Sequence, residues 1–527
     1  MLSTGNNTTI EPEIRTSRAP AVVYWCALAL LAGVIILGLT GPLLTLGRFI
    51  PLDTNEGWNA YFGQAAIEGG QLYPPRDSLI TNNYPPLSFY IVGGAGRLLG
   101  DNIFAGRLIA LFSLLFVCWS IYYWLRRTGS EQKPALFGAG VFLAYAVTYG
   151  RDYTAMDDPQ WLAHAMMMGG FLLLWRGMFA GSGTRPGPGA LAPEPGMLPA
   201  LPRTRDLIAA SILMIAAGWT KHLLVTLPLT ATVWLLWRSR WAFAKWAVCC
   251  AVVLAATLVL AWWLYGAPFF DNLLAPRVYL RHQAIARTIG ALKIFWPVLI
   301  LWLMTLIRGR LDQRITFVSL YLAIAGVIGI GAIGGVGVDV NAFFDAMIAM
   351  SLMSGLALET LGSRAAASLG SRAPGSAAPA IAAAAAVVSA LWIANYARTV
   401  APGQLQAIAT IQAREKSALG DIELIREQGR GRAACEQPGL CYWANSRFMV
   451  DFFYLGQRLN TGALPLSTCT RAFEGSEIAL VQLEANLKYR HRVLPEYCND
   501  IITSHYRAVR ESSWGTFLVP ITPAARE

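Results

Sequence analysis

Charged residues are scarce in this 527-residue sequence: they make up 14% of the chain, while hydrophobic residues make up 55%. A soluble globular protein has about 25% charged residues. The shortage excludes an ordinary soluble protein and indicates an integral membrane protein. The net charge of +11 does not predict a nucleic-acid partner, because the basic residues fall in short clusters between apolar runs and not in one basic domain.

Motifs of nucleotide-dependent and zinc enzymes are also missing. We identify no P-loop, and no Rossmann fingerprint in the strand-and-helix context that it requires. No CxxC or HxxxH spacing accompanies the cysteines, so a zinc site is the less favoured interpretation of them. We also find no internal repeat of the kind that is common in transporters.

Long apolar runs dominate the first 400 residues. We predict an α-helical polytopic membrane domain over 21–396, with about eleven transmembrane helices of roughly 17 to 25 residues each. The runs lie at 21–45, 103–125, 134–150, 160–179, 206–220, 222–237, 243–265, 291–307, 315–333, 341–361 and 377–396. Lys and Arg gather in alternate connections, which marks the cytoplasmic side. Residues 1–20 are therefore expected in the cytoplasm, and residues 397–527 on the other side of the membrane.

Residues 46–102 form an outer loop that is far longer than a simple reversal needs. The pattern predicts an amphipathic helix over 55–68, capped by Thr54 or Asp53. A second helix over 86–99 would span about 21 Å, which is too short to cross the hydrocarbon core, so it should lie in the interface.

The polar C-terminal region, 397–527, is predicted to be a small α/β domain. We expect a helix over about 403–428 and strands in "FMVDFFYLG" and "WGTFLVP". Four cysteines lie here, and in an oxidising compartment they indicate two disulfides. Three connectivities are open, and we favour Cys435 with Cys441 and Cys469 with Cys498.

Every outer turn carries ionisable residues at the end of a helix, so we expect a polar cavity on the outer side. The candidates are Asp53, Glu56, Asp157, Asp158, Lys221, His222, Arg277, Arg281, His282, Asn341 and Asp345. A carboxylate can act as general base on a hydroxyl. Cations can stabilise a phosphate leaving group as negative charge develops on it. With no nucleotide site, the activated substrate would have to be attached to a lipid.

The order of these motifs resembles the C superfamily of polytopic glycosyltransferases, GT-C, including the protein O-mannosyltransferases and aminoarabinose transferases. The resemblance rests on Asp53 and Glu56, then "NNYPPLSFYIVGGAGRLLGD", "MDDPQ", "GWTKH" and "GVDVNAFFD", and it covers about 400 residues. Many relatives have an adjacent Asp-Glu pair in the first outer loop. This chain has Asn55 before Glu56, so the base stays open between Asp53, which we favour, and Glu56.

The resemblance implies an inverting transfer of a sugar from a polyprenyl-phosphate donor in a bacterial inner membrane, with the C-terminal domain in the periplasm. The base would deprotonate an acceptor hydroxyl of lipid A, a polysaccharide, a glycolipid or a protein. The lipid phosphate would be held by Lys221, His222, Arg277, Arg281 and His282.

In the same reading, Asp157 or Asp158 would orient the acceptor or support the base. Tyr84, Asn341 and Asp345 would contact the substrates. No catalytic metal is expected, although the outer carboxylates could hold a divalent cation through oxygen ligands. The alternatives are a transporter or flippase of a lipid-linked saccharide, and a non-catalytic scaffold.

Overall fold

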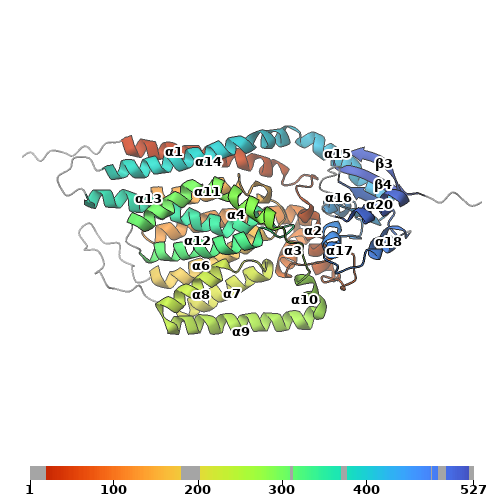
Figure 1. Cartoon of the computed structure of the whole chain (residues 1–527), viewed down its shortest axis with the longest axis horizontal. Coiled ribbons are helices and arrows are strands. Elements are labelled where there is room, and N and C mark those ends of the chain that lie inside the picture. The colour runs from red at the N-terminus through yellow and green to blue at the C-terminus, as the bar shows by residue number, and fades with distance from the viewer. Residues whose placement is uncertain are drawn as a thin grey trace, which may run out of the picture.

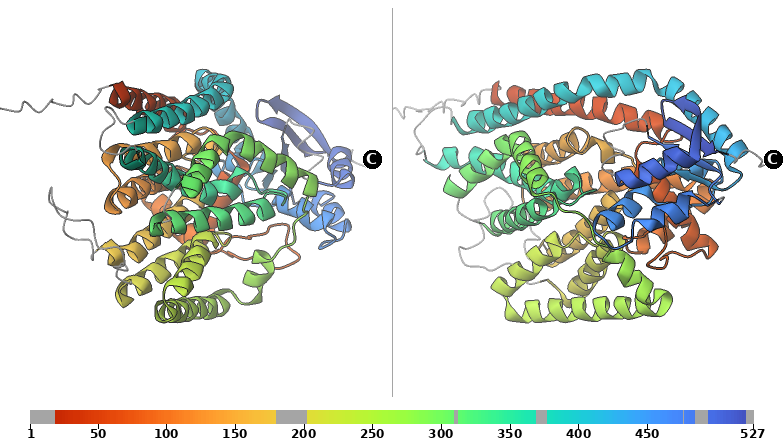
Figure 2. Two further views of the ribbon diagram at one scale, coloured as in Figure 1. Left: turned by 60° about the vertical axis from the view of Figure 1, so that its left-hand side comes forward. Right: turned by 45° about the vertical axis from the view of Figure 1, so that its right-hand side comes forward.

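The structure is a computed structural model that describes residues 19–179, 202–308, 312–368, 377–475, 477–484 and 494–521. Most of the predicted cytoplasmic segment, residues 1–18, lies outside the described residues. Long helices run roughly side by side through most of the molecule, and a small domain with a sheet lies at one end of them (Figure 1). The two further views show the same division (Figure 2).

Each of the eleven predicted apolar runs coincides with a helix. They are α1 (Ala19–Thr45), α4 (Asn102–Arg127), α5 (Gln132–Ala146), α6 (Gln160–Phe179), α7 (Thr204–Thr220), α8 (Thr226–Arg238), α9 (Arg240–Tyr265), α11 (Arg281–Arg308), α12 (Gln313–Ala332), α13 (Phe344–Ser368) and α14 (Ala377–Ala409). By length and composition, seven of the described helices could cross a membrane: α1, α4, α9, α11, α12, α13 and α14. The predicted count of eleven spans is therefore supported for seven.

Burial differs strongly between these helices. In the most apolar stretch of α13, 78% of the residues are buried inside the molecule, whereas in α9 only 6% are. Helix α13 packs against α5, α11, α12 and α14, and α1 lies along α14 (Figure 1). Helix α9 instead turns apolar residues outward, including Trp262 and Trp263 near its end. Aromatic residues at such a position are typical of a membrane–water interface.

The first outer loop contains the two predicted helices, α2 (Thr54–Glu68) and α3 (Leu87–Leu99). The side chain of Asp53 caps α2, since its Oδ1 accepts a hydrogen bond from the Asn55 N–H at 2.8 Å. The two helices cross closely at Gly63 and Gly93: a Cβ atom on Gly93 would lie 2.1 Å from the Gly63 carbonyl oxygen. Glycine at this crossing allows the backbones to approach each other.

Short elements connect several of the long helices. They are the 3₁₀ helices η1 (Arg151–Tyr153) and η3 (Val340–Phe343) and the short helix α10 (Ala267–Leu273). The segment after α10 pairs with the segment before η3 through an isolated bridge between Tyr279 and Gly335. These turns bring the ends of helices that are distant in the sequence close together.

The C-terminal domain has a four-stranded sheet in the order β1-β2-β4-β3. Its strands are β1 (Ala433–Cys435), β2 (Leu480–Leu483), β3 (Tyr506–Ser512) and β4 (Gly515–Pro520). Strands β1 and β2 are parallel and the other pairs are antiparallel. The helices are α15 (Ile411–Leu424), the π-helical turn η5 (Ile425–Gly429), α16 (Pro438–Trp443), α17 (Phe452–Asn460), α18 (Ser467–Phe473) and α20 (Glu496–His505). A small α/β domain is therefore confirmed.

One predicted strand of this domain is wrong, and one predicted helix is interrupted. The run "FMVDFFYLG" forms helix α17 instead of a strand: Asp451 caps the helix, and Phe452, Leu455 and Leu459 bury one helical face. A short apolar run has the same appearance in a strand and in a buried helix, which explains the error. The helix expected over 403–428 is divided, because α14 continues to Ala409 and α15 follows it.

Both predicted disulfides are present. Cys435 pairs with Cys441, which joins β1 to α16, and Cys469 pairs with Cys498, which joins α18 to α20. One bridge connects a helix to the sheet and the other connects two helices, within a domain of limited core size.

The C-terminal domain is seated directly on α2 through α16. A Cβ atom on Gly57 would lie 2.0 Å from the Gly439 backbone nitrogen, so the two helices touch backbone to backbone. Tyr61 supports the same contact: its hydroxyl donates to the Ser446 carbonyl at 2.8 Å, and its ring stacks on Phe448. The position of the domain therefore depends on a glycine in the middle of a helix.

We expect Gly57→Ala to lower the melting temperature in detergent, because the added methyl group meets backbone atoms that cannot rotate away. Overpacking of this kind costs about 1–3 kcal/mol. Gly94→Ala in α3 is the matched control, since a Cβ there meets no atom within 4 Å and alanine favours the helix by up to about 1 kcal/mol. Thermal unfolding followed by intrinsic fluorescence measures both. Equal melting temperatures for the two variants would contradict the close contact.

Candidate active site

A buried ion pair joins the first outer loop to α4. The guanidinium of Arg107 contacts both oxygens of Glu56, with Nε to Oε1 at 2.8 Å and Nη2 to Oε2 at 2.7 Å. The two side chains are 1% and 0% exposed. Arg107 also donates to the carbonyls of Thr45, Arg48 and Ile50 at 2.6 to 2.9 Å. One arginine therefore binds the end of α1, the following turn and the start of α2.

Glu56 has further backbone partners. Its oxygens accept hydrogen bonds from the N–H groups of Leu52 at 2.9 Å and Asp157 at 3.2 Å. Both oxygens are thus occupied by Arg107 and by main-chain donors. This geometry leaves neither oxygen of Glu56 without a donor.

Asp157 lies in the same buried layer, against α4. Its Oδ1 occupies the space where Gly106 would carry a Cβ, at 1.9 Å, and its Oδ2 is buried without a hydrogen-bond partner among the described residues. Burial raises the pKa of Asp157 well above its usual value, and the charges of Glu56 and Asp158 raise it further. This environment favours the protonated form of Asp157, which suits a structural role.

Asp158 and Lys221 form a second buried ion pair, between the turn before α6 and the end of α7. Lys221 Nζ lies 2.8 Å from Asp158 Oδ1, and the side chains are 3% and 2% exposed. The same oxygen accepts the Gln160 N–H at 2.8 Å, at the start of α6. The ammonium group also lies 4.8 Å from the centre of the Tyr84 ring, a cation–π contact. Tyr84 and Lys221 are thus neighbours, although 137 positions separate them in the sequence.

Asp53, at the start of α2, interacts electrostatically with Asp158 of this pair. Burial raises the pKa of Asp53 to about 6; the hydrogen bond from the Asn55 N–H opposes the rise, and the charges of Glu56, Asp158 and Asp152 add to it. The carboxyl group remains half-buried, while Asp158 and Glu56 are buried. Asp53 is therefore the most accessible carboxylate of the three and is charged at neutral pH.

Arg277 approaches the same region from the segment after α10. Its guanidinium receives support from the C-terminal domain: it donates a hydrogen bond to the Tyr454 hydroxyl and lies 5.1 Å from the centre of that ring. It also interacts electrostatically with Tyr84 and with Asp451. Arg277 therefore lies at a junction between the membrane domain and α17.

Asp451 and Tyr454 were not predicted as site residues. Asp451 Oδ2 accepts a hydrogen bond from Trp58 Nε1 at 3.0 Å, and burial raises the pKa of Asp451 to about 7 against the effect of its hydrogen bonds. The only sequence signal was an aspartate inside the aromatic run "FMVDFFYLG". That run was assigned to a strand, and nothing in the sequence placed it beside α2.

An aromatic cluster lies at this junction. Trp58 of α2 is surrounded by Phe62, Tyr84, Phe89 and Tyr454, with ring centres 4.7 to 6.4 Å apart. Most of these contacts are edge-to-face, the arrangement that aromatic quadrupoles favour. The cluster holds Tyr84 and Tyr454 in place beside the two cations Lys221 and Arg277.

Among the remaining predicted residues, Arg281 and His282 lie apart from the cluster and His222 lies next to it. Arg281 and His282 lie exposed in the first turn of α11, and no hydrogen bond or ion pair of the described residues connects them to the cluster. His222 follows Lys221, and its Nδ1 is buried without a hydrogen-bond partner in the described part of the chain. Of these three, His222 alone adjoins the cations: its ring interacts electrostatically with Arg277 and Lys221.

Asn341 and Asp345 lie on another side, where α6, α12 and α13 meet. Asn341 Nδ2 donates to Gln160 Oε1 at 3.1 Å. Asp345 accepts from the Tyr321 hydroxyl at 2.5 Å, and His164 Nε2 lies 3.9 Å from it. These contacts join helices inside the membrane domain. Asn341 directly, and Asp345 through His164, adjoin Gln160 next to the Asp158 turn.

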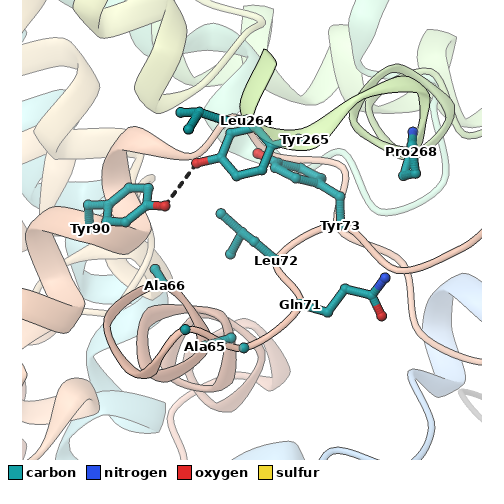
Figure 3. A pocket seen from close by; sticks show the side chains of 11 residues that line it. Ala65, Ala66, Gln71, Leu72, Tyr73, Tyr90, Leu264, Tyr265 and Pro268 are labelled. Carbon is teal, nitrogen blue, oxygen red and sulfur yellow. Dashed lines mark hydrogen bonds between the residues drawn. The ribbon is translucent and has the colours of Figure 1, made fainter. Parts of the chain in front are cut away.

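Two pockets flank the charged cluster without including Asp53, Asp158 or Lys221. The first lies between the end of α2, residues 69–73, α3 and the junction of α9 with α10 (Figure 3). Tyr90 and Tyr265 meet across it, with their hydroxyl groups 2.9 Å apart. The second lies between residues 75–81, α10 and α17. The described residues contain no group of three or more His, Cys, Asp or Glu positioned to hold a metal ion.

Helices, interfacial loop and appended domain together have the fold of two solved membrane proteins, an ArnT and an oligosaccharyltransferase. Among solved structures, the chain is similar to ArnT from Cupriavidus metallidurans in the apo state, with a TM-score of 0.59 and 12% identity over 94% of this chain and 98% of that one. It is also similar to the same ArnT bound to undecaprenyl phosphate, with a TM-score of 0.56 and 15% identity over 96% and 99%.

A third similar structure is the Archaeoglobus fulgidus oligosaccharyltransferase tethered to an acceptor peptide, with a TM-score of 0.52 and 12% identity over 95% of this chain and 74% of that one. No family model matches the sequence, and neither does any curated protein. At these identities the likeness establishes the fold predicted from the sequence.

We expect Arg107→Met to lower the free energy of unfolding by about 3–5 kcal/mol, because Glu56 is left buried without its charged partner. Arg48→Met is the matched control: its ion pair with Glu415 is partly exposed, at 37% and 20%, and such a pair contributes about 1 kcal/mol or less. Denaturant unfolding in detergent measures both variants. A loss for Arg107→Met no larger than that for Arg48→Met would contradict the role of the buried pair.

Proposed function

We propose that this chain is an inverting membrane glycosyltransferase that moves a sugar from a polyprenyl-phosphate donor to a hydroxyl group of a cell-envelope acceptor. The observation that carries the proposal is the buried Asp158–Lys221 pair with Tyr84 against Lys221, a group with which Asp53 and Arg277 interact electrostatically. The transfer needs a base for the acceptor hydroxyl and cations that stabilise the departing phosphate. The GT-C fold supports the same class of reaction.

The donor phosphate is assigned to the cations. Lys221 is a compact positive charge and Arg277 a planar guanidinium, and both are held by side chains from distant parts of the chain. Tyr84 contacts the first and interacts electrostatically with the second. The ArnT structure that binds undecaprenyl phosphate supports a lipid phosphate as ligand. Arg281 and His282 are exposed and therefore have a weaker claim to this role.

The proton transfer is assigned to Asp53. In the proposed step, Asp53 takes the proton of the acceptor hydroxyl, and the acceptor oxygen forms a bond to the anomeric carbon from the face opposite the phosphate. The bond between the anomeric carbon and the phosphate oxygen breaks, and its electron pair leaves with the lipid phosphate. Asp158 positions Lys221 for that departing charge, and Glu56 positions the loop through Arg107.

The acceptor is a hydroxyl of a lipid, a polysaccharide, a glycolipid or a protein at the outer side of the bacterial inner membrane. The acceptor peptide in the oligosaccharyltransferase structure supports the use of large acceptors in this fold. Two disulfides in the C-terminal domain support its location in the oxidising periplasm.

Asp53→Asn is expected to reduce the transfer rate about 10²–10⁴-fold, the usual contribution of a general base, while donor binding is retained. Asparagine can still cap α2 through its side-chain oxygen, so the fold should persist. Asp500→Asn, an exposed carboxylate in α20, is the control and should keep the full rate. The assay measures sugar release from a purified polyprenyl-phosphate sugar, with donor binding measured in parallel. Full transfer by Asp53→Asn would rule out this base.

The transfer rate should depend on pH through Asp53. The base acts when deprotonated, and burial raises its pKa to about 6, so the rate should fall as pH drops below about 6 and reach a plateau above it. Asp451→Asn removes the other buried carboxyl with a pKa near neutrality, about 7, and should keep the same inflection. A pH–rate profile under donor-limiting conditions tests this. An inflection that disappears in Asp451→Asn would reassign it to Asp451.

A further inference from the structure

The second pocket is a separate polar recess on the outer side of the molecule. It lies between the first outer loop at residues 75–81, helix α10 and helix α17 of the C-terminal domain. Asp53, Asp158, Lys221 and Arg277 do not line it. The proposed transfer reaction leaves it without a role.

A buried arginine forms one wall of this recess. Arg458 of α17 is only 5% exposed. Its Nη1 donates to the Ser78 carbonyl at 3.0 Å and to Thr81 Oγ1 at 3.3 Å. These contacts fix the guanidinium without neutralising it, because both partners are uncharged. A buried guanidinium that forms no direct ion pair is costly to desolvate, so this arginine points to an anionic ligand.

A second arginine faces the same recess. Arg76 lines the pocket and is exposed, and its positive charge acts together with burial to lower the pKa of Arg458, while Asp77 and Asp451 oppose this. Neither arginine forms an ion pair with a carboxylate of the described residues. Asp271 is the one acidic residue among those that line the pocket. Two arginines against one aspartate leave the recess positive.

The rim of the recess is apolar on the side of α10. Leu274 is 77% exposed there, and Phe270 lines the pocket beside it. Helix α10 begins two residues after the end of α9, whose exposed Trp262 and Trp263 mark the membrane interface. A ligand in this position would meet arginines at one end and a lipid-facing surface at the other.

The walls are held rigidly around this space. Asn272 of α10 accepts the Asn82 N–H at 2.9 Å and donates to the Pro74 carbonyl at 2.7 Å. It therefore ties α10 to both ends of the loop segment that carries Arg76. Arg458 ties the same segment to α17. The recess is thus preformed by three parts of the chain.

We propose that this recess binds the phosphate-bearing headgroup of a membrane amphiphile, with Arg458 and Arg76 on the phosphate and the apolar chains along Leu274 and Phe270. Arginine suits phosphate because its planar N–H donors match the phosphate oxygens. A soluble anion would use the arginines but would gain nothing from the apolar rim. This binding site does not depend on the proposed transfer reaction.

The test is native mass spectrometry of the full chain released from detergent with phosphatidic acid or phosphatidylcholine of the same acyl chains. The unaltered protein should retain phosphatidic acid in preference to phosphatidylcholine. Arg458→Gln and Arg76→Gln should each weaken this retention, by about tenfold for the buried Arg458. Arg97→Gln, an exposed arginine at the end of α3, is the control and should behave like the unaltered protein.

Three outcomes would overturn the proposal. The first is equal retention of phosphatidic acid by Arg76→Gln and Arg97→Gln; Arg76 is exposed, so this comparison does not depend on a variant of a buried residue folding. The second is loss of retention in Arg277→Gln alone, which would place the lipid at the donor site. The third is inorganic phosphate binding as tightly as phosphatidic acid, which would mean that the apolar rim plays no part. Asp53→Asn should retain the lipid, so failure of the proposed base leaves this result unaffected.

Discussion

The ion pair between Glu56 and Arg107 is the interaction on which the outer half of the molecule depends. Arg107 points from α4 into a turn and donates hydrogen bonds to its carbonyls at Thr45, Arg48 and Ile50. Glu56 neutralises it and binds the Asp157 N–H. The end of α1, the start of α2 and the turn before α6 therefore meet at one buried charge pair. Asp53 and Asp158 are the neighbours of these anchored residues, and so their proximity follows from it.

Charge burial also separates the roles of the carboxylates. Glu56 is saturated with donors, Asp157 lies against Gly106 in a setting that favours the protonated form, and Asp158 is paired with Lys221. Asp53 has a single backbone donor, from Asn55, and a half-buried position. Four carboxyl groups in one region thus have four environments, and only one combines negative charge with access. Arg277 and Arg281 also differ in environment: Arg277 lies against Tyr454, whereas Arg281 is exposed.

The C-terminal domain belongs to the candidate site and is more than an appendage. Asp451 binds Trp58, and Tyr454 binds Arg277, so α17 closes one side of the aromatic cluster. Arg458 on the same helix reaches the first outer loop. The contacts of Asp451 and Arg458 join residues nearly 400 positions apart in the sequence. A further contact joins the domain to α2: Gly57 has no side chain at the place where α16 lies against it, which lets the two backbones touch.

The sequence by itself determined the elements whose physics is local. Apolar runs predicted the long helices, the start of the pattern narrowed the cap of α2 to Thr54 or Asp53, and the four C-terminal cysteines predicted two disulfides with the favoured pairing. It also placed charged residues at the helix ends. What the tertiary structure decided was which of them meet. Arg107 looked like one residue of an apolar helix, and "FMVDFFYLG" looked like a strand, because the cost of a buried charge and the partner of an apolar face depend on neighbours that lie far away in the chain.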